Sequence, residues 1–192
     1  MTTYLLHGGA TSKDLLGNDN FFAQFTALVD KPKVKILLCY FSRKKEEWEK
    51  LTKRDTKNIS TNADKDYDYH VVKNSEDLFK KLPDYDVLYV AGGDAELLEP
   101  FYKELSKIKT MLSGKIYAGS SMGTFMASES YVLSNDAQDS DSVHKGIGLL
   151  PIQTLCHWDV ENKGQNKMEL LMKYSKTPII ALNEGELVKI YR

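Results

Sequence analysis

The sequence Gly119-x-Ser121-x-Gly123 places a glycine two residues before and two residues after a serine. In this spacing the serine side chain could act as a nucleophile. A short apolar run precedes the motif and an apolar-periodic segment follows it, which predicts a strand, a sharp turn and a helix. Such a turn lifts the Ser121 hydroxyl clear of the sheet, and the amide of Met122 faces the same point. The motif could therefore supply a nucleophile and half of an oxyanion hole. The alternative is a Gly/Ser-rich turn in which Ser121 only caps the helix.

A serine hydroxyl is a weak nucleophile until a base takes its proton, and the base needs a third group that fixes its tautomer. His157 is the candidate base because it ends a predicted strand downstream of Ser121, and His7 is a rival because it also ends a strand. If the chain order is Ser, Asp, His, Asp136 is the best-placed third member, since it closely follows the strand-like residues 130–133. The alternative for Asp136 is an Asx-turn. The interval also contains the carboxylates Glu129, Asp139 and Asp141.

Strands alternate with helices along the chain, and several strands are continuous apolar runs, as expected for a parallel sheet covered on both faces. The pattern predicts an α/β protein, a three-layer α/β/α sandwich with a mostly parallel sheet. Strands are expected over residues 4–6, 34–41, 69–72, 86–91, 116–118 and 152–157, and helices over residues 18–28, 43–57, 75–82, 95–109 and 166–174. Residues 179–182 and 187–191 flank Asn183-Glu-Gly-Glu, which predicts a hairpin.

Three glycine-containing turns follow predicted strands: His7-Gly-Gly, Gly92-Gly93 and Gly119-x-Ser121. In parallel sheets the functional site lies outside the carboxyl ends of the strands. We therefore expect the three turns to converge on one cleft.

The composition favours one domain over residues 1–192 and a small partner. Lys+Arg 26 against Asp+Glu 27 leaves a formal charge of -1, so no net attraction to nucleic acid or to an anionic membrane is expected. The two cysteines, Cys39 and Cys156, lie in apolar runs, which suits buried thiols in a reducing cytoplasm. No stretch has the length of a membrane span, and the first residues lack the features of a signal peptide.

Four motifs together resemble the peptidase E group of serine peptidases, which includes aspartyl dipeptidase and, more distantly, cyanophycinase. They are Gly119-Ser-Ser-Met-Gly123, Gly92-Gly93 ahead of a helix, Asn135-Asp136, and Gly148-Leu-Leu-Pro151 followed by His157. The resemblance implies the class I glutamine amidotransferase-like (flavodoxin-like) fold and hydrolysis of dipeptides that begin with aspartate, without a metal or an organic cofactor. It further implies that Ser121 is the nucleophile, His157 the base and Asp136 its orienting carboxylate. The oxyanion hole is then formed by the amides of Gly93 and Met122.

The chain departs from the family pattern at the elbow, where Met122 and Thr124 replace alanines, and at Asp94, where the family has asparagine. An added carboxylate near the cleft disfavours acidic substrate side chains unless a cation intervenes, and Arg43 and Lys145 are the candidate cations. Gly92, Asp94 and His7 are expected to contact the substrate.

Two other functions fit the same residues. One is an esterase or amidase that uses the triad on a non-peptide substrate, and the other is a non-catalytic binding protein with an amidotransferase-like fold. The protein is expected to be a monomer or a homodimer.

Overall fold

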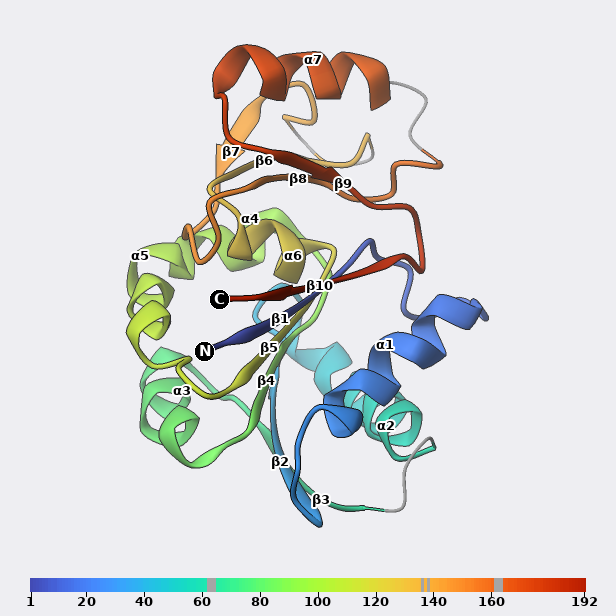
Figure 1. Cartoon of the computed structure of the whole chain (residues 1–192), viewed down its shortest axis with the longest axis vertical. Helices are drawn as coiled ribbons and strands as arrows, with labels where there is room; N and C mark the ends of the chain where they lie inside the picture. Colours follow the sequence, from blue (N-terminus) through green and yellow to red (C-terminus); the bar gives the residue numbers. More distant parts are fainter. Residues whose placement is uncertain (62–64, 136, 138, 161–163) are drawn as a thin grey trace.

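The computed structural model describes residues 1–61, 65–135, 137, 139–160 and 164–192, and this part of the chain forms two sheets (Figure 1). The larger sheet has six strands in the order β10-β1-β5-β4-β2-β3. Strands β1 to β5 run parallel, and β10 pairs antiparallel with β1. The strands are β1 (Thr3–His7), β2 (Lys33–Cys39), β3 (Asp66–Val71), β4 (Val87–Val90), β5 (Ile116–Ser120) and β10 (Leu187–Tyr191).

Helices cover both faces of this sheet, because neighbouring apolar residues of each strand point to opposite sides. Leu5 packs with Phe21 of α1 (Leu16–Ala27) and Leu51 of α2 (Trp48–Ser60). Leu6 faces the opposite core, which contains side chains from α3 (Ser75–Lys81), α4 (Ala95–Leu98), α5 (Tyr102–Leu105) and α6 (Met122–Ala127). The predicted three-layer α/β/α arrangement is confirmed (Figure 1).

A smaller sheet lies beyond α6, with α7 (Gly164–Tyr174) over its outer face (Figure 1). Its order is β7-β6-β8-β9, and β6, β8 and β9 run parallel. Leu171 of α7 packs on Val132 and Leu155 of this sheet. The strands are β6 (Ser130–Val132), β7 (Val143–Lys145), β8 (Gln153–Leu155) and β9 (Ile179–Ala181).

The hairpin predicted around Asn183-Glu-Gly-Glu is wrong. Strand β9 pairs with β8 in the small sheet, whereas β10 pairs with β1 in the large one. The intervening residues 182–186 cross from one sheet to the other. These residues have the composition of a turn, but the strands on either side pair with β8 and β1, which lie far away in the sequence.

The helix predicted over residues 95–109 is also not continuous. Short 3-10 segments, η3 (Glu99–Phe101) and η4 (Ser106–Thr110), follow α4 and α5. Pro100 has no amide hydrogen to donate, so the regular helix cannot run through it. Two further 3-10 segments are η1 (Lys45–Glu47) and η2 (Leu82–Asp84).

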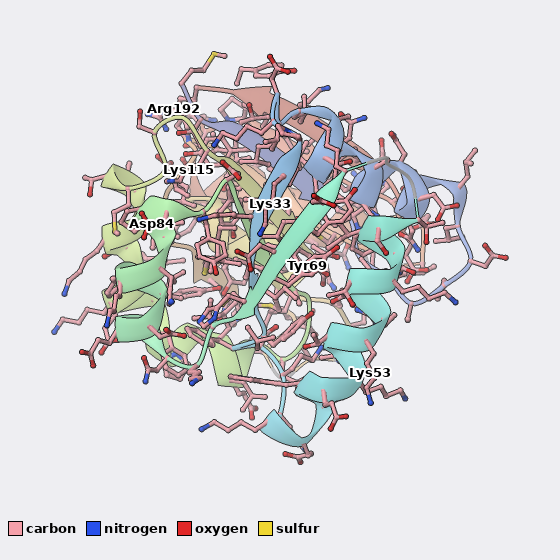
Figure 2. The ribbon with its side chains drawn as sticks, turned by 90° about the horizontal axis from the view of Figure 1, so that it is seen from below. Lys33, Lys53, Tyr69, Asp84, Lys115 and Arg192 are labelled. Atoms are coloured by element: carbon pink, nitrogen blue, oxygen red, sulfur yellow. The ribbon has the colours of Figure 1, made fainter. Side chains whose placement is uncertain are left out.

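Figure 2 shows the molecule from below, with the edge strand β3 and its Tyr69 in front of the large sheet. Cys39 and Cys156 are free and buried, as predicted. Burial raises the pKa of both thiols, that of Cys39 to about 12. Among the described residues, none of the helices has the length and apolarity that crossing a bilayer requires.

Candidate active site

Ser121 lies at the sharp turn between β5 and α6. Its backbone has φ 49° and ψ −107°, a conformation that non-glycine residues rarely adopt. The turn is held by two backbone hydrogen bonds, from the Ser121 amide to the His7 carbonyl and from the Phe125 amide to the Ser121 carbonyl. The half-buried Ser121 side chain lines a cleft. This is the geometry of a nucleophile elbow.

The two glycines of the motif are required by close packing. A Cβ atom at Gly119 would lie 2.5 Å from the carbonyl group of Gly123, and one at Gly123 would lie 2.1 Å from the Val90 carbonyl oxygen. Thr124, which differs from the family pattern, donates its hydroxyl to the carbonyls of His7 and Gly119 and accepts the His7 amide. Thr124 therefore ties the elbow to strand β1.

His157 presents its ring to the serine. Ser121 Oγ lies 3.1 Å from His157 Nε2. The His157 backbone is in the left-handed region, with φ 58°, and its amide donates to the Gly8 carbonyl. A Cβ at Gly9 would lie 2.4 Å from the imidazole, so the glycine there allows the loop after β1 to pack against the ring.

Glu184 occupies the other side of the imidazole, where sequence reasoning placed Asp136. His157 Nδ1 lies 3.0 Å from Glu184 Oε1, and Lys13 pairs with the second carboxylate oxygen. Partial burial pushes the pKa of Glu184 upward, but hydrogen bonds from Lys13 and His157 outweigh it, so the pKa lies below its usual value. An ionised carboxylate only accepts hydrogen bonds, so the proton is on Nδ1 and Nε2 is free to accept from Ser121.

The sequence did not single out Glu184, and Asp136 lies outside the described residues. The sequence pattern predicts Glu184 only as a turn residue of a hairpin, and that hairpin does not form. Its position instead follows from the crossing between the two sheets, where the Gly185 amide donates to the Gly9 carbonyl and the Gly8 amide donates to the Glu186 carbonyl. The one signal in the sequence was a carboxylate just after an apolar strand.

The predicted oxyanion-hole residues, Met122 and Gly93, lie in two turns next to the serine. Met122 is the first residue of α6, so its amide has no acceptor within the helix. The Gly92-Gly93 turn packs on the elbow, since a Cβ at Gly92 would lie 3.0 Å from the Cβ of Ser121. At Gly93 a Cβ would lie 2.1 Å from the Ser42 carbonyl oxygen, so only glycine lets the turn pass. The Met122 side chain is buried in the core behind the turn.

The cleft beside Ser121 has a volume of about 730 Å³, and its lining carries two kinds of side chain. The basic ones are Arg43, Lys44 and Arg54, of which Arg54 lies against Thr11 of the loop after β1. The lining also contains Phe125, Leu133 and a hydrogen-bonded pair, Glu99 and His144. In the part of the chain that the structure describes, no group of three or more His, Cys, Asp or Glu side chains is placed to hold a metal ion.

The three residues predicted to contact the substrate differ in position. Gly92 and Asp94 line the cleft, and the exposed Asp94 precedes α4 without a side-chain hydrogen bond to it. His7 is fully buried, stacks on Phe21 and does not line the cleft. Burial lowers the pKa of His7 to about 4 and keeps the ring neutral. Of the two candidate cations, Arg43 reaches the cleft and Lys145 does not.

Comparison with known proteins gives the same fold. The chain is similar to a peptidase from an acI-B1 Actinobacterium, with 16% identity, a TM-score of 0.67, and 99% of this chain and 83% of that chain covered. It is also similar to a putative peptidase E protein from Listeria monocytogenes EGD-e, with 15% identity, a TM-score of 0.63, and 100% and 99% covered. The comparison with curated proteins gives no match.

The fold and the serine elbow define the class: a serine hydrolase of the α/β/α type. The model of peptidase family S51 matches residues 5–191, and the chain belongs to that family. It is therefore a peptidase E-like serine peptidase.

Proposed function

We propose that this protein cleaves small peptides through an acyl-enzyme formed on Ser121, with His157 as base and Glu184 as the carboxylate that orients it. The hydrogen-bonded series Ser121–His157–Glu184 at the mouth of the cleft is the observation that carries the proposal. We give Glu184 the role that the family resemblance implies for Asp136, because Glu184 lies against Nδ1 and its pKa is lowered.

In the first step Ser121 Oγ attacks the peptide carbonyl carbon while its proton passes to His157 Nε2. The carbonyl oxygen becomes an oxyanion, which the amides of Gly93 and Met122 bind. When the C–N bond breaks, His157 gives its proton to the leaving amine. A water molecule then attacks the ester, with His157 again as base, and Ser121 is regenerated.

The substrate class is a short peptide, because the cleft of about 730 Å³ has the scale of a small ligand and the family is one of peptidases. Strict specificity for an N-terminal aspartate is not proposed. Asp94 and Glu99 both line the cleft and disfavour a second negative charge near them. We further propose that residues 1–192 act as one peptidase E-like domain, and that the protein works in the cytoplasm as a monomer or homodimer, without nucleic acid or membrane partners.

A panel of dipeptides tests the proposal. We expect release of free amino acids by the wild-type protein and none by Ser121→Ala, with neutral N-terminal residues preferred over aspartate. Retention of activity in Ser121→Ala would overturn the mechanism.

The alternative is an esterase or amidase that acts on non-peptide substrates. Hydrolysis of p-nitrophenyl esters, measured under the same conditions as that of the dipeptides, distinguishes it from a peptidase. The ratio of the two values of kcat/KM decides between them. A non-catalytic binding protein would cleave neither.

A further inference from the structure

Two arginines line the part of the cleft next to the loop after β1, and the reaction above does not use them. Arg43 follows β2 and Arg54 lies on α2, so neither belongs to the elbow or to the His157 turn. Both side chains are half-buried. Neither forms an ion pair with the cleft residues Asp94 and Glu96 within the described residues.

Arg43 is fixed but not neutralised. Its Nε donates to the Gly92 carbonyl oxygen at 2.6 Å. Among the residues that the structure describes, its terminal nitrogens have no hydrogen-bond acceptor and no carboxylate within ion-pair distance. The guanidinium is thus oriented by one bond and keeps its forked face for a ligand.

Arg54 is held from behind. Its Nε and Nη2 bond to Oδ1 of the fully buried Asp55, at 2.8 and 2.7 Å, and Tyr40 donates to Oδ2 of the same carboxylate. Desolvation lowers the pKa of Arg54, but the adjacent Asp55 outweighs it, so the guanidinium stays charged. Among the described residues, Asp55 is the one carboxylate within ion-pair distance of either guanidinium, and it pairs with Arg54 rather than Arg43.

The loop after β1 links the arginines to the base of the reaction. His157 delivers the proton to the leaving amine, and the loop after β1 packs on His157 through Gly9. Two residues further along this loop, the Thr11 hydroxyl lies 3.5 Å from Arg54 Nη2. Arg43 packs against Gly93, since a Cβ there would lie 2.8 Å from Arg43 Nε.

We propose that Arg43 and Arg54 form a carboxylate-binding subsite for the leaving residue of the peptide. The inference rests on the proposed function and deepens it: the protein selects peptides whose leaving residue carries a carboxylate. That carboxylate is either the C-terminal group of a dipeptide or an acidic side chain. A guanidinium binds a carboxylate through two parallel hydrogen bonds, and partial burial strengthens them.

The test compares three substrates with the same N-terminal residue, the one that the wild-type protein cleaves fastest: X-Ala, X-Ala-amide and X-Asp-amide. We expect wild type to prefer X-Ala over X-Ala-amide by about 10- to 100-fold in kcat/KM, the scale of one charge-assisted pair. Activity restored by X-Asp-amide would identify a side-chain carboxylate as a ligand, and activity confined to X-Ala would identify the C-terminal group.

The variants are Arg43→Gln, Arg43→Lys and the control Lys53→Gln, which removes an exposed charge from α2 outside the cleft (Figure 2). Arg43→Gln should remove most of the preference for the free acid, Arg43→Lys should keep part of it, and Lys53→Gln should keep all of it. Arg54 is not substituted, because its loss would leave the buried Asp55 carboxylate without its ion-pair partner and destabilise the fold. Equal cleavage of acid and amide by wild type, or an unchanged preference in Arg43→Gln, would overturn the subsite and leave the proposed function standing.

Binding separates the two proposals if no peptide is cleaved. Calorimetry with Ser121→Ala should show tighter binding of X-Ala than of X-Ala-amide, and Ser121→Ala/Arg43→Gln should lose the difference. Selective binding without cleavage by wild type would support the subsite and reject the peptidase reaction. Equal binding of acid and amide would reject the subsite.

Discussion

Replacing Glu184 by glutamine removes one charge beside His157 and little volume. In the reaction His157 becomes an imidazolium, which the carboxylate stabilises across the 3.0 Å contact. Two unit charges about 4 Å apart attract by about 4 kcal/mol at an effective dielectric constant of about 20. Lys13 pairs with the same carboxylate and already offsets part of its charge, so the net effect is smaller. We expect kcat/KM to fall by about 100-fold, equivalent to about 3 kcal/mol, with KM little changed.

The matched control is Glu186→Gln, a substitution of the same kind in the same crossing segment. Glu186 accepts the Asn183 amide and makes no contact with His157 in the described structure, so its variant should keep near wild-type efficiency. The assay is steady-state dipeptide hydrolysis, with unfolding curves to show that both variants fold. Equal efficiencies for the two variants would refute the role of Glu184. If Asp136→Asn instead gave the large loss in kcat, the orienting role would return to Asp136.

The remaining predictions concern Asp94 and His7. Asp94→Asn should leave the melting temperature unchanged, since the Asp94 side chain makes no capping hydrogen bond. It should raise kcat/KM for N-terminal aspartyl peptides relative to neutral ones by up to about 5-fold, the scale of an exposed charge pair. An unchanged ratio would show that Asp94 does not affect specificity. For His7, the folded pKa of about 4 lies below the ordinary 6.5, so between these values the unfolded chain binds a proton that the folded one does not. The free energy of unfolding should therefore fall as the pH drops from 6.5 to 4, by at most about 3 kcal/mol from this residue. Urea unfolding across this range should show a smaller pH dependence in His7→Gln, and the same slope as wild type would contradict the assignment.

Local pattern was enough to predict the elements that surround Ser121. The glycine spacing specified the elbow because each glycine meets a backbone carbonyl where no side chain fits. Continuous apolar runs predicted the parallel strands, and the segments that follow β1, β4 and β5 reach the cleft, which Ala10, Gly92 and Ser121 line.

The contact of Glu184 with His157 could not be predicted, because the position of Glu184 depends on strand pairing far apart in the sequence. Asn183-Glu-Gly-Glu has the composition of a hairpin turn, yet β9 and β10 join different sheets. The local sequence does not distinguish a turn that joins two strands of one sheet from a segment that connects two different sheets. Arg43 was a candidate cation in the sequence, but Arg54 could not be predicted for a similar reason: only folding brings Arg54 of α2 to Thr11.

The most direct test of the central claim is the reaction of Ser121 with a fluorophosphonate, followed by the mass of the intact protein and by peptide mapping. We predict one adduct, located on Ser121, that forms slowly in His157→Ala and is absent in Ser121→Ala. A protein that stays unmodified, or an adduct that persists in Ser121→Ala, would contradict the assignment of Ser121 as the nucleophile.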